Sequence, residues 1–234
     1  MTYLTGKNLF ATYGTVPILR GCSVGVNRGE LAVIVGPNGA GKSTVMKVLL
    51  GLLPISEGEV LLDGKDISTL STQQRIGLGL AFVPQNNNIF PTMSVAENLE
   101  MGAFLRHDDC QATLDEVYTL FPILFEKRQQ LAGQLSGGQR QQVAFGRAMM
   151  TQPTVLLLDE PTAGVSPIVI DEIFANILAL KEANKAVLMV EQNTQQALSI
   201  ADKGFVLVAG KNAHTGTGKA LLNDDEVRRD FLGG

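Results

Sequence analysis

Short, uninterrupted apolar runs alternate along the chain with stretches whose apolar residues recur at helical spacing. Five runs predict buried strands, at Leu31–Val35, Leu80–Val83, Val155–Leu158, Ala186–Val190 and Gly204–Val208. Helices are expected at Lys42–Leu50, which Gly51 terminates, and at Ile168–Ala183, and a hairpin is expected at 59–67 around Asp63-Gly64. Apolar strands separated by helices are typical of an α/β fold with a largely parallel sheet.

The stretch from about residue 88 to residue 150 lacks such strands and indicates a helical subdomain (88–150) within a single domain (1–234). Ser94 and Glu97 have the spacing of a capping box, and Ser136 is placed to cap a further helix. The helices expected there are 94–104, Gln111–Leu120 and Gln139–Met150.

Composition and charge exclude several classes of protein. Of the 234 residues, 45% are hydrophobic and 18% are charged, which is typical of a globular chain. The net charge of −4 argues against a nucleic-acid partner. Cys22 and Cys110 are far apart and His107 and His214 are isolated, so we expect reduced thiols, exposed histidines and no structural metal. Met1–Phe10 lacks signal-peptide features and no apolar run could cross a bilayer, so a role at a membrane would need a membrane-spanning partner.

The residues after the first apolar run match the phosphate-binding pattern G-x-x-x-x-G-K-[ST]. Glycines let backbone N–H groups turn toward phosphates, and the N-terminus of the following helix adds a partial positive charge. Lys42 is expected to reach the β- and γ-phosphates of a nucleotide, and the Ser43 hydroxyl to bind Mg²⁺. The nucleotide-binding residues expected from this motif are Gly36, Pro37, Asn38, Gly39, Ala40, Gly41, Lys42, Ser43 and Thr44.

Two acids follow the apolar run Val155–Leu158. Ligands of parallel sheets bind at the carboxyl ends of the strands, which is where Asp159 and Glu160 lie in the sequence. We expect Asp159 to hold Mg²⁺, directly or through water, and Glu160 to act as the general base on the attacking water. The sequence therefore predicts hydrolysis of a nucleoside triphosphate.

A second glycine-rich turn, Leu135-Ser-Gly-Gly-Gln139, offers another anion site at a helix start. Together with the phosphate loop and the paired acids, in this order, it resembles the signature of ATP-binding cassette (ABC) ATPases over nearly the whole chain. The resemblance implies a P-loop NTPase core with an N-terminal antiparallel β subdomain and a helical insertion, with ATP and Mg²⁺ as cofactors.

The same resemblance implies roles for single residues. Tyr13 would stack on adenine, and Gln85 would sense Mg²⁺ and water and contact a membrane subunit. The signature residues would face the γ-phosphate held by another ATPase subunit, so that a complete site needs two chains; they are Ser136, Gly137, Gly138 and Gln139.

Four further segments resemble one subfamily, the second, smaller ATP-binding subunit of branched-chain amino acid importers; they are Glu97–Phe104, Glu57–Gly64, Val190–Asn193 and Leu221–Asp224. Importers of urea and short amides are also similar. The resemblance implies two membrane permease subunits, a second ATPase subunit, a periplasmic or extracellular solute-binding protein, and a peripheral location at the cytoplasmic face of the cell membrane.

Two positions depart from the general family pattern. Gln192 occupies the place of a histidine that contacts the γ-phosphate, and an amide can donate a hydrogen bond but cannot become cationic. Pro167 occupies the place of an aspartate at the subunit contact. We therefore expect this chain to pair with a different ATPase chain, giving two unequal sites, although a homodimer stays open.

Three other functions fit the ATP motifs. One is an exporter or lipid-transport motor, which would have the same site. Another is a soluble cassette protein of translation or chromosome maintenance, which usually carries two cassettes or a long coiled coil, neither of which is present. The last is a regulatory binding module with weak activity, although Lys42, Asp159 and Glu160 are all intact.

Overall fold

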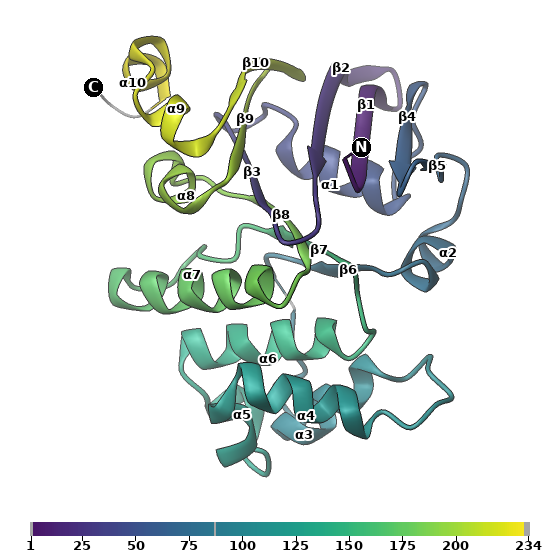
Figure 1. The fold of residues 1–234 in the computed structure, drawn as a ribbon, viewed down its shortest axis with the longest axis vertical. Coiled ribbons are helices and arrows are strands. Elements are labelled where there is room, and N and C mark those ends of the chain that lie inside the picture. The colour runs from purple at the N-terminus through teal and green to yellow at the C-terminus, as the bar shows by residue number, and fades with distance from the viewer. Residues whose placement is uncertain (1, 87, 232–234) are drawn as a thin grey trace.

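The computed structural model describes residues 2–86 and 88–231, which form two β-sheets flanked by helices (Figure 1). The strands are β1 (Leu4–Tyr13), β2 (Val16–Val26), β3 (Leu31–Val35), β4 (Glu57–Leu62), β5 (Lys65–Asp66), β6 (Leu80–Val83), β7 (Val155–Asp159), β8 (Ala186–Val190), β9 (Lys203–Val208) and β10 (Lys211–Gly216). The first sheet is antiparallel, in the order β2-β1-β4-β5. The second has the order β10-β9-β3-β8-β7-β6 and is parallel except for its edge strand β10.

The helices are α1 (Lys42–Leu50), α2 (Thr72–Gly77), α3 (Val95–Gly102), α4 (Gln111–Leu120), α5 (Pro122–Glu126), a 3₁₀ turn η1 (Ala132–Gln134), α6 (Gly137–Met149), α7 (Pro167–Glu182), α8 (Thr194–Ile200), α9 (Gly218–Leu222) and α10 (Asp225–Phe231). Helices α3 to α6 gather at the end of the molecule away from the first sheet (Figure 1). Among the described residues, no helix has both the length and the apolar character needed to cross a membrane.

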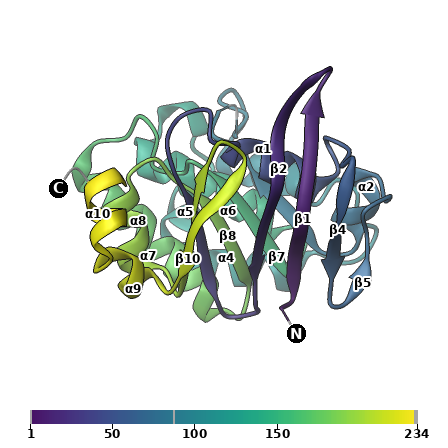
Figure 2. The same cartoon turned by 90° about the horizontal axis from the view of Figure 1, so that it is seen from above.

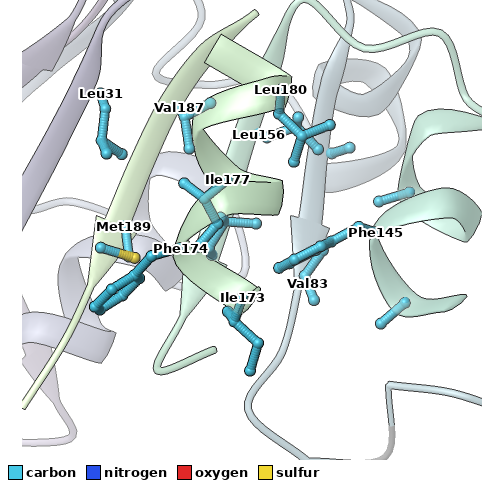
Figure 3. Packing of buried hydrophobic residues seen from close by; sticks show 14 of the residues in the cluster. Leu31, Val83, Phe145, Leu156, Ile173, Phe174, Ile177, Leu180, Val187 and Met189 are labelled. Atoms are coloured by element: carbon cyan, nitrogen blue, oxygen red, sulfur yellow. The ribbon is translucent and has the colours of Figure 1, made fainter. Parts of the chain in front are cut away.

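Two apolar cores lie on opposite faces of the second sheet. One fills the space between the two sheets and includes α1 residues such as Val45 and Met46, and the view from above shows the strands of the first sheet crossing this face (Figure 2). The other core lies under α6 and α7, where Ile177 of α7 lies between the sheet residue Val187 and Phe145 of α6 (Figure 3). The sheet is covered on both faces, which explains why its inner strands β3 and β8 are apolar throughout.

The structure confirms most expected elements and corrects some bounds. Strands β3 and β8 and helices α1 and α4 have the expected limits, and the expected hairpin is β4–β5. Helix α3 ends at Gly102 rather than at residue 104, and α6 begins at Gly137 because Ser136 caps it. The expected exposure of His214 is wrong: it is half-buried, because the ring of Phe231, at the end of α10, lies 6.3 Å from its own.

Candidate functional site

Four neighbouring parallel strands, β3, β8, β7 and β6, end at one edge of the second sheet. The segment after each strand carries at least one expected site residue: Lys42 follows β3, Gln192 follows β8, Glu160 follows β7 and Gln85 follows β6. The strand order therefore brings together residues that are far apart in sequence, such as Ser43 and Asp159, which are 116 positions apart. The carboxyl edge of such a sheet is the usual place for a ligand.

The phosphate loop, Gly36–Thr44, has the backbone shape that its glycines allow. Gly36 and Gly41 have φ of 143° and 102°, and a side chain on Gly36 would collide with the carbonyl of Leu207. The Lys42 ammonium donates hydrogen bonds to Gly36 O (2.8 Å) and Pro37 O (3.2 Å), which ties the helix start to the loop. A cavity of about 260 Å³ opens here, lined by Ile18, Asn38, Gly39, Gly41, Lys42, Ser43, Thr44 and Glu160.

Electrostatics at this cavity suit an anion. Burial lowers the pKa of Lys42, and the nearby carboxylates of Glu160 and Asp159 oppose that shift. Triphosphate oxygens would stabilise the charged form of Lys42 that burial disfavours, because they are anionic hydrogen-bond acceptors.

Asp159 ends β7 beside the phosphate loop. The Ser43 hydroxyl donates to Asp159 Oδ1 at 3.3 Å. Burial and the neighbouring Glu160 raise the pKa of Asp159, so a cation would relieve the cost of its ionised form. A hydroxyl and one carboxylate beside a phosphate cavity fit Mg²⁺, which keeps waters and substrate phosphates as its other ligands. No cluster of three or more histidine, cysteine or acidic residues that could hold a metal exists within the described residues.

Glu160 is buried and adopts a left-handed backbone with φ of 48°. Its peptide N–H donates to Val190 O at 2.9 Å, which fixes the turn against β8. Two side-chain amides, from Gln85 and from Gln192, each donate to Glu160 Oε2 at 2.7 Å. The two amides thus hold one oxygen of the carboxylate, Oε2, from two neighbouring segments.

The signature residues lie apart from the phosphate loop in this single chain. Ser136 forms a capping box with Gln139 at the start of α6. Gly137 lines a separate cavity of about 480 Å³ that also includes Gln85 and Gly164. Tyr13 is 43% exposed at the end of β1, with Lys47 Nζ 5.6 Å from its ring centroid, and it does not line the phosphate cavity.

Sequence reasoning missed two buried residues of this edge, Glu191 and Thr162. The Glu191 carboxylate accepts from Thr162 N and Thr162 Oγ1 at 3.0 and 2.8 Å. An acid directly after the apolar run Ala186–Val190 was the available signal, since the same pattern drew attention to Asp159.

Comparisons with known proteins agree with this geometry. The family model described as "ABC transporter" matches residues 19–163, more than half of the chain. The chain is 41% identical to the high-affinity branched-chain amino acid transport ATP-binding protein BraG of Pseudomonas aeruginosa, over 95% of this chain and 96% of that one. It is 35% identical to the lipopolysaccharide export system ATP-binding protein LptB of Haemophilus influenzae, over 100% and 98% of the two chains.

A solved structure also matches over both full lengths. It is the ADP conformation of an ATP-binding cassette of an ABC transporter, with a TM-score of 0.90 and 30% identity. Sequence and fold thus agree over the same residues, and the chain belongs to the ABC transporter family as an ATP-binding, ATP-hydrolysing protein.

Proposed function

We propose that this chain is the energy-coupling ATPase subunit of an importer for branched-chain amino acids. The catalytic part of the proposal is carried by one observation: Ser43, Asp159 and Glu160 converge at the phosphate cavity. The solute is supported by the 41% identity to BraG over nearly the whole chain.

The side chains divide the work of ATP hydrolysis. The loop N–H groups and Lys42 hold the β- and γ-phosphates. Ser43 and Asp159 would hold Mg²⁺, which when bound neutralises phosphate charge. Glu160 takes a proton from the attacking water at Oε1, a role that typically contributes about 10²–10⁴-fold in rate. Gln85 and Gln192 keep its carboxylate in place through Oε2.

A second ATPase chain completes each site in this proposal. Ser136 and Gly137 are not among the residues that line the phosphate cavity of their own chain. The Ser136 N–H donates to Gln139 Oε1, so the Ser136 hydroxyl and the Gly137 N–H at the start of α6 are the groups offered to the γ-phosphate of a partner. Gln192 and Pro167 replace residues usual in the family, which supports a heterodimer with unequal sites. Purification from the native host exclusively as a homodimer of this chain would contradict the heterodimer.

An apolar groove supports the contact with a permease. It has a volume of about 280 Å³ and lies between Leu52, β6 and α6. Arg147 lines it, stacks at 4.9 Å on the exposed ring of Phe90, and has a buried Nη1 without an acceptor in the described part of the chain. Burial alone lowers the pKa of Arg147, since no carboxylate offsets it. An apolar permease helix with one acidic side chain matches these features.

Two equally exposed apolar residues test this docking. Leu52, 56% exposed, lines the groove, whereas Val16, also 56% exposed, is the first residue of β2 and does not line it. In affinity purification from native membranes, Leu52→Glu should lose the permeases and Val16→Glu should retain them. Equal retention by both variants would remove the groove from the permease contact.

The 35% identity to LptB keeps lipid export as a second candidate. Transport by reconstituted vesicles distinguishes import from lipid export. The complex that co-purifies with this chain is inserted into vesicles, and ATP is supplied on the side of the membrane where the ATPase chain lies. For the proposed importer, leucine uptake should require ATP and a solute-binding protein, and urea should compete weakly or not at all. ATP-dependent release of lipid without amino-acid uptake would replace the importer with an exporter.

A further inference from the structure

Glu191 is a carboxylate that is only 2% exposed, directly after β8. Burial raises the pKa of Glu191, and an ionised group in such a place is stable only when hydrogen bonds replace its water. The hydrogen-bond donors to the Glu191 carboxylate therefore indicate what this buried acid does.

Each oxygen of Glu191 has its own partner. Oε1 accepts from Thr162 N at 3.0 Å and from Thr162 Oγ1 at 2.8 Å, and Oε2 accepts from the peptide N–H of Gln192 at 3.2 Å. The peptide N–H of Glu191 donates to Ile34 O at 3.2 Å. One residue thus connects the segments that follow β7 and β8 with the end of β3, which leads into the phosphate loop.

These bonds close a ring through the hydrolytic residues. Thr162 lies two residues after Glu160, and Gln192 donates from its side chain to Glu160 Oε2 at 2.7 Å. The peptide N–H of Glu160 in turn donates to Val190 O. The Glu191 carboxylate therefore sets the spacing between Glu160 and Gln192, because it is bonded both to Thr162, in the segment of Glu160, and to the peptide N–H of Gln192.

We propose that Glu191 is a positioning residue for ATP hydrolysis, which holds the Gln192 amide and the Glu160 carboxylate in register. It does not line the phosphate cavity, and it acts through its two neighbours. Only an ionised carboxylate suits all three donors, because the amide of a glutamine would turn an NH₂ group toward one of them. Oε1 of Glu191 also holds the start of the loop 162–166, through Thr162. Val165 of that loop lies beside Gly137 of the signature turn. The ring of hydrogen bonds therefore also reaches the segment that a second chain would contact.

Four variants of the chain, each measured in the complex that co-purifies with it, test the proposal by phosphate release. Glu191→Gln keeps the shape and should lower kcat about 10–100-fold, the usual cost of a small misplacement, with an unchanged KM for ATP. Glu191→Asp should retain more activity than Glu191→Gln if the charge matters. Thr162→Val should lower kcat and Thr162→Ser, which keeps the hydroxyl, should restore it.

A double variant separates positioning from general stability. If Glu191 acts through Gln192, the loss from Glu191→Gln should shrink to about twofold or less in a Gln192→Ala background, because residues in one network are not additive. Full additivity, or a rise in KM that accounts for the loss, would overturn the proposal. Should Glu191→Gln fail to fold, Thr162→Val and Thr162→Ser in the Gln192→Ala background test the same coupling.

Discussion

The side-chain amide of Gln192 donates a 2.7 Å hydrogen bond to Oε2 of Glu160. Gln85 donates to the same oxygen from the opposite part of the sheet edge, so that one carboxylate oxygen is held by two neutral donors. An amide does not titrate near neutral pH, in contrast to the histidine usual at position 192. The geometry around Glu160 should therefore not depend on pH through this residue.

Replacement of Glu160 by glutamine separates binding from hydrolysis. In Glu160→Gln the amide oxygen can still accept from Gln85 and Gln192, but the group cannot take a proton from water. ATP affinity should be retained and kcat should fall about 10²–10⁴-fold. Glu30→Gln is the control, since the Glu30 carboxylate also accepts a hydrogen bond, from Asn27 N at 2.6 Å, but Glu30 directly precedes β3, at the edge of the sheet opposite the site. Fluorescent nucleotide binding and phosphate release measure the two effects, and undiminished turnover in Glu160→Gln would exclude it as the base.

Replacement of Gln192 by histidine should introduce a pH dependence that the natural chain lacks. An imidazole titrates at about pH 6.5. Its cationic form would pair with Glu160 and make the Glu160 carboxylate a weaker base. The kcat of Gln192→His should therefore fall, relative to the natural chain, as the pH decreases from 8 to about 6. Gln195→His, exposed on α8, is the control and should keep the natural pH profile. Identical profiles for all three proteins would show that position 192 does not influence the base.

The elements that sequence predicted well are those whose burial is uniform. Leu31–Val35 and Ala186–Val190 are apolar at every position because helices and a second sheet cover both faces of the sheet. Strand β1 offers no such signal: it is polar at many positions, contains Asn8 with φ of 49°, and pairs with β2 through several register shifts. The bounds of β1 and β2 therefore had to come from the structure.

The site was predictable as a set of residues but not as a geometry. The phosphate loop and the acids Asp159 and Glu160 each follow an apolar run, so their position at a sheet edge could be inferred. The contact of Gln85 with Glu160 joins residues 75 positions apart. It exists because β6 pairs with β7, and a sequence does not reveal which strands become neighbours. The ring through Glu191 depends on the same pairing order, with β8 inserted between β3 and β7.

Asp159 should destabilise the nucleotide-free protein at neutral pH. Its folded pKa is raised by burial and by Glu160, so the folded state binds the proton more tightly than the unfolded state. The cost of ionising it is absent below the ordinary pKa of an aspartate and fully present above the raised folded pKa. Asp159→Asn removes this cost and should raise the Tm at pH 7, with a difference that narrows as the pH falls toward about 4.

Asp66 provides a control of opposite sign. Hydrogen bonds from Ser68 lower its pKa, so its ionised form contributes stability that is lost as the pH falls through the folded pKa. Asp66→Asn should not raise the Tm at pH 7. Thermal melts without nucleotide compare the two variants, and a Tm of Asp159→Asn at or below that of the natural protein at pH 7 would contradict the assignment.

Ser136 should contribute both to folding and to turnover, whereas a second serine with the same cap should contribute to folding alone. Ser136 and Ser94 each accept from the N–H three residues on, at 3.2 Å, and each belongs to a complete capping box at the start of a helix. Loss of such a cap costs about 1 kcal/mol, so Ser136→Ala and Ser94→Ala should each lower the Tm by about 2–4 °C. If the signature turn serves the γ-phosphate of a partner chain, only Ser136→Ala should also lower kcat at temperatures where both variants are folded. Equal losses of activity in the two variants would mean that Ser136 acts through helix stability alone.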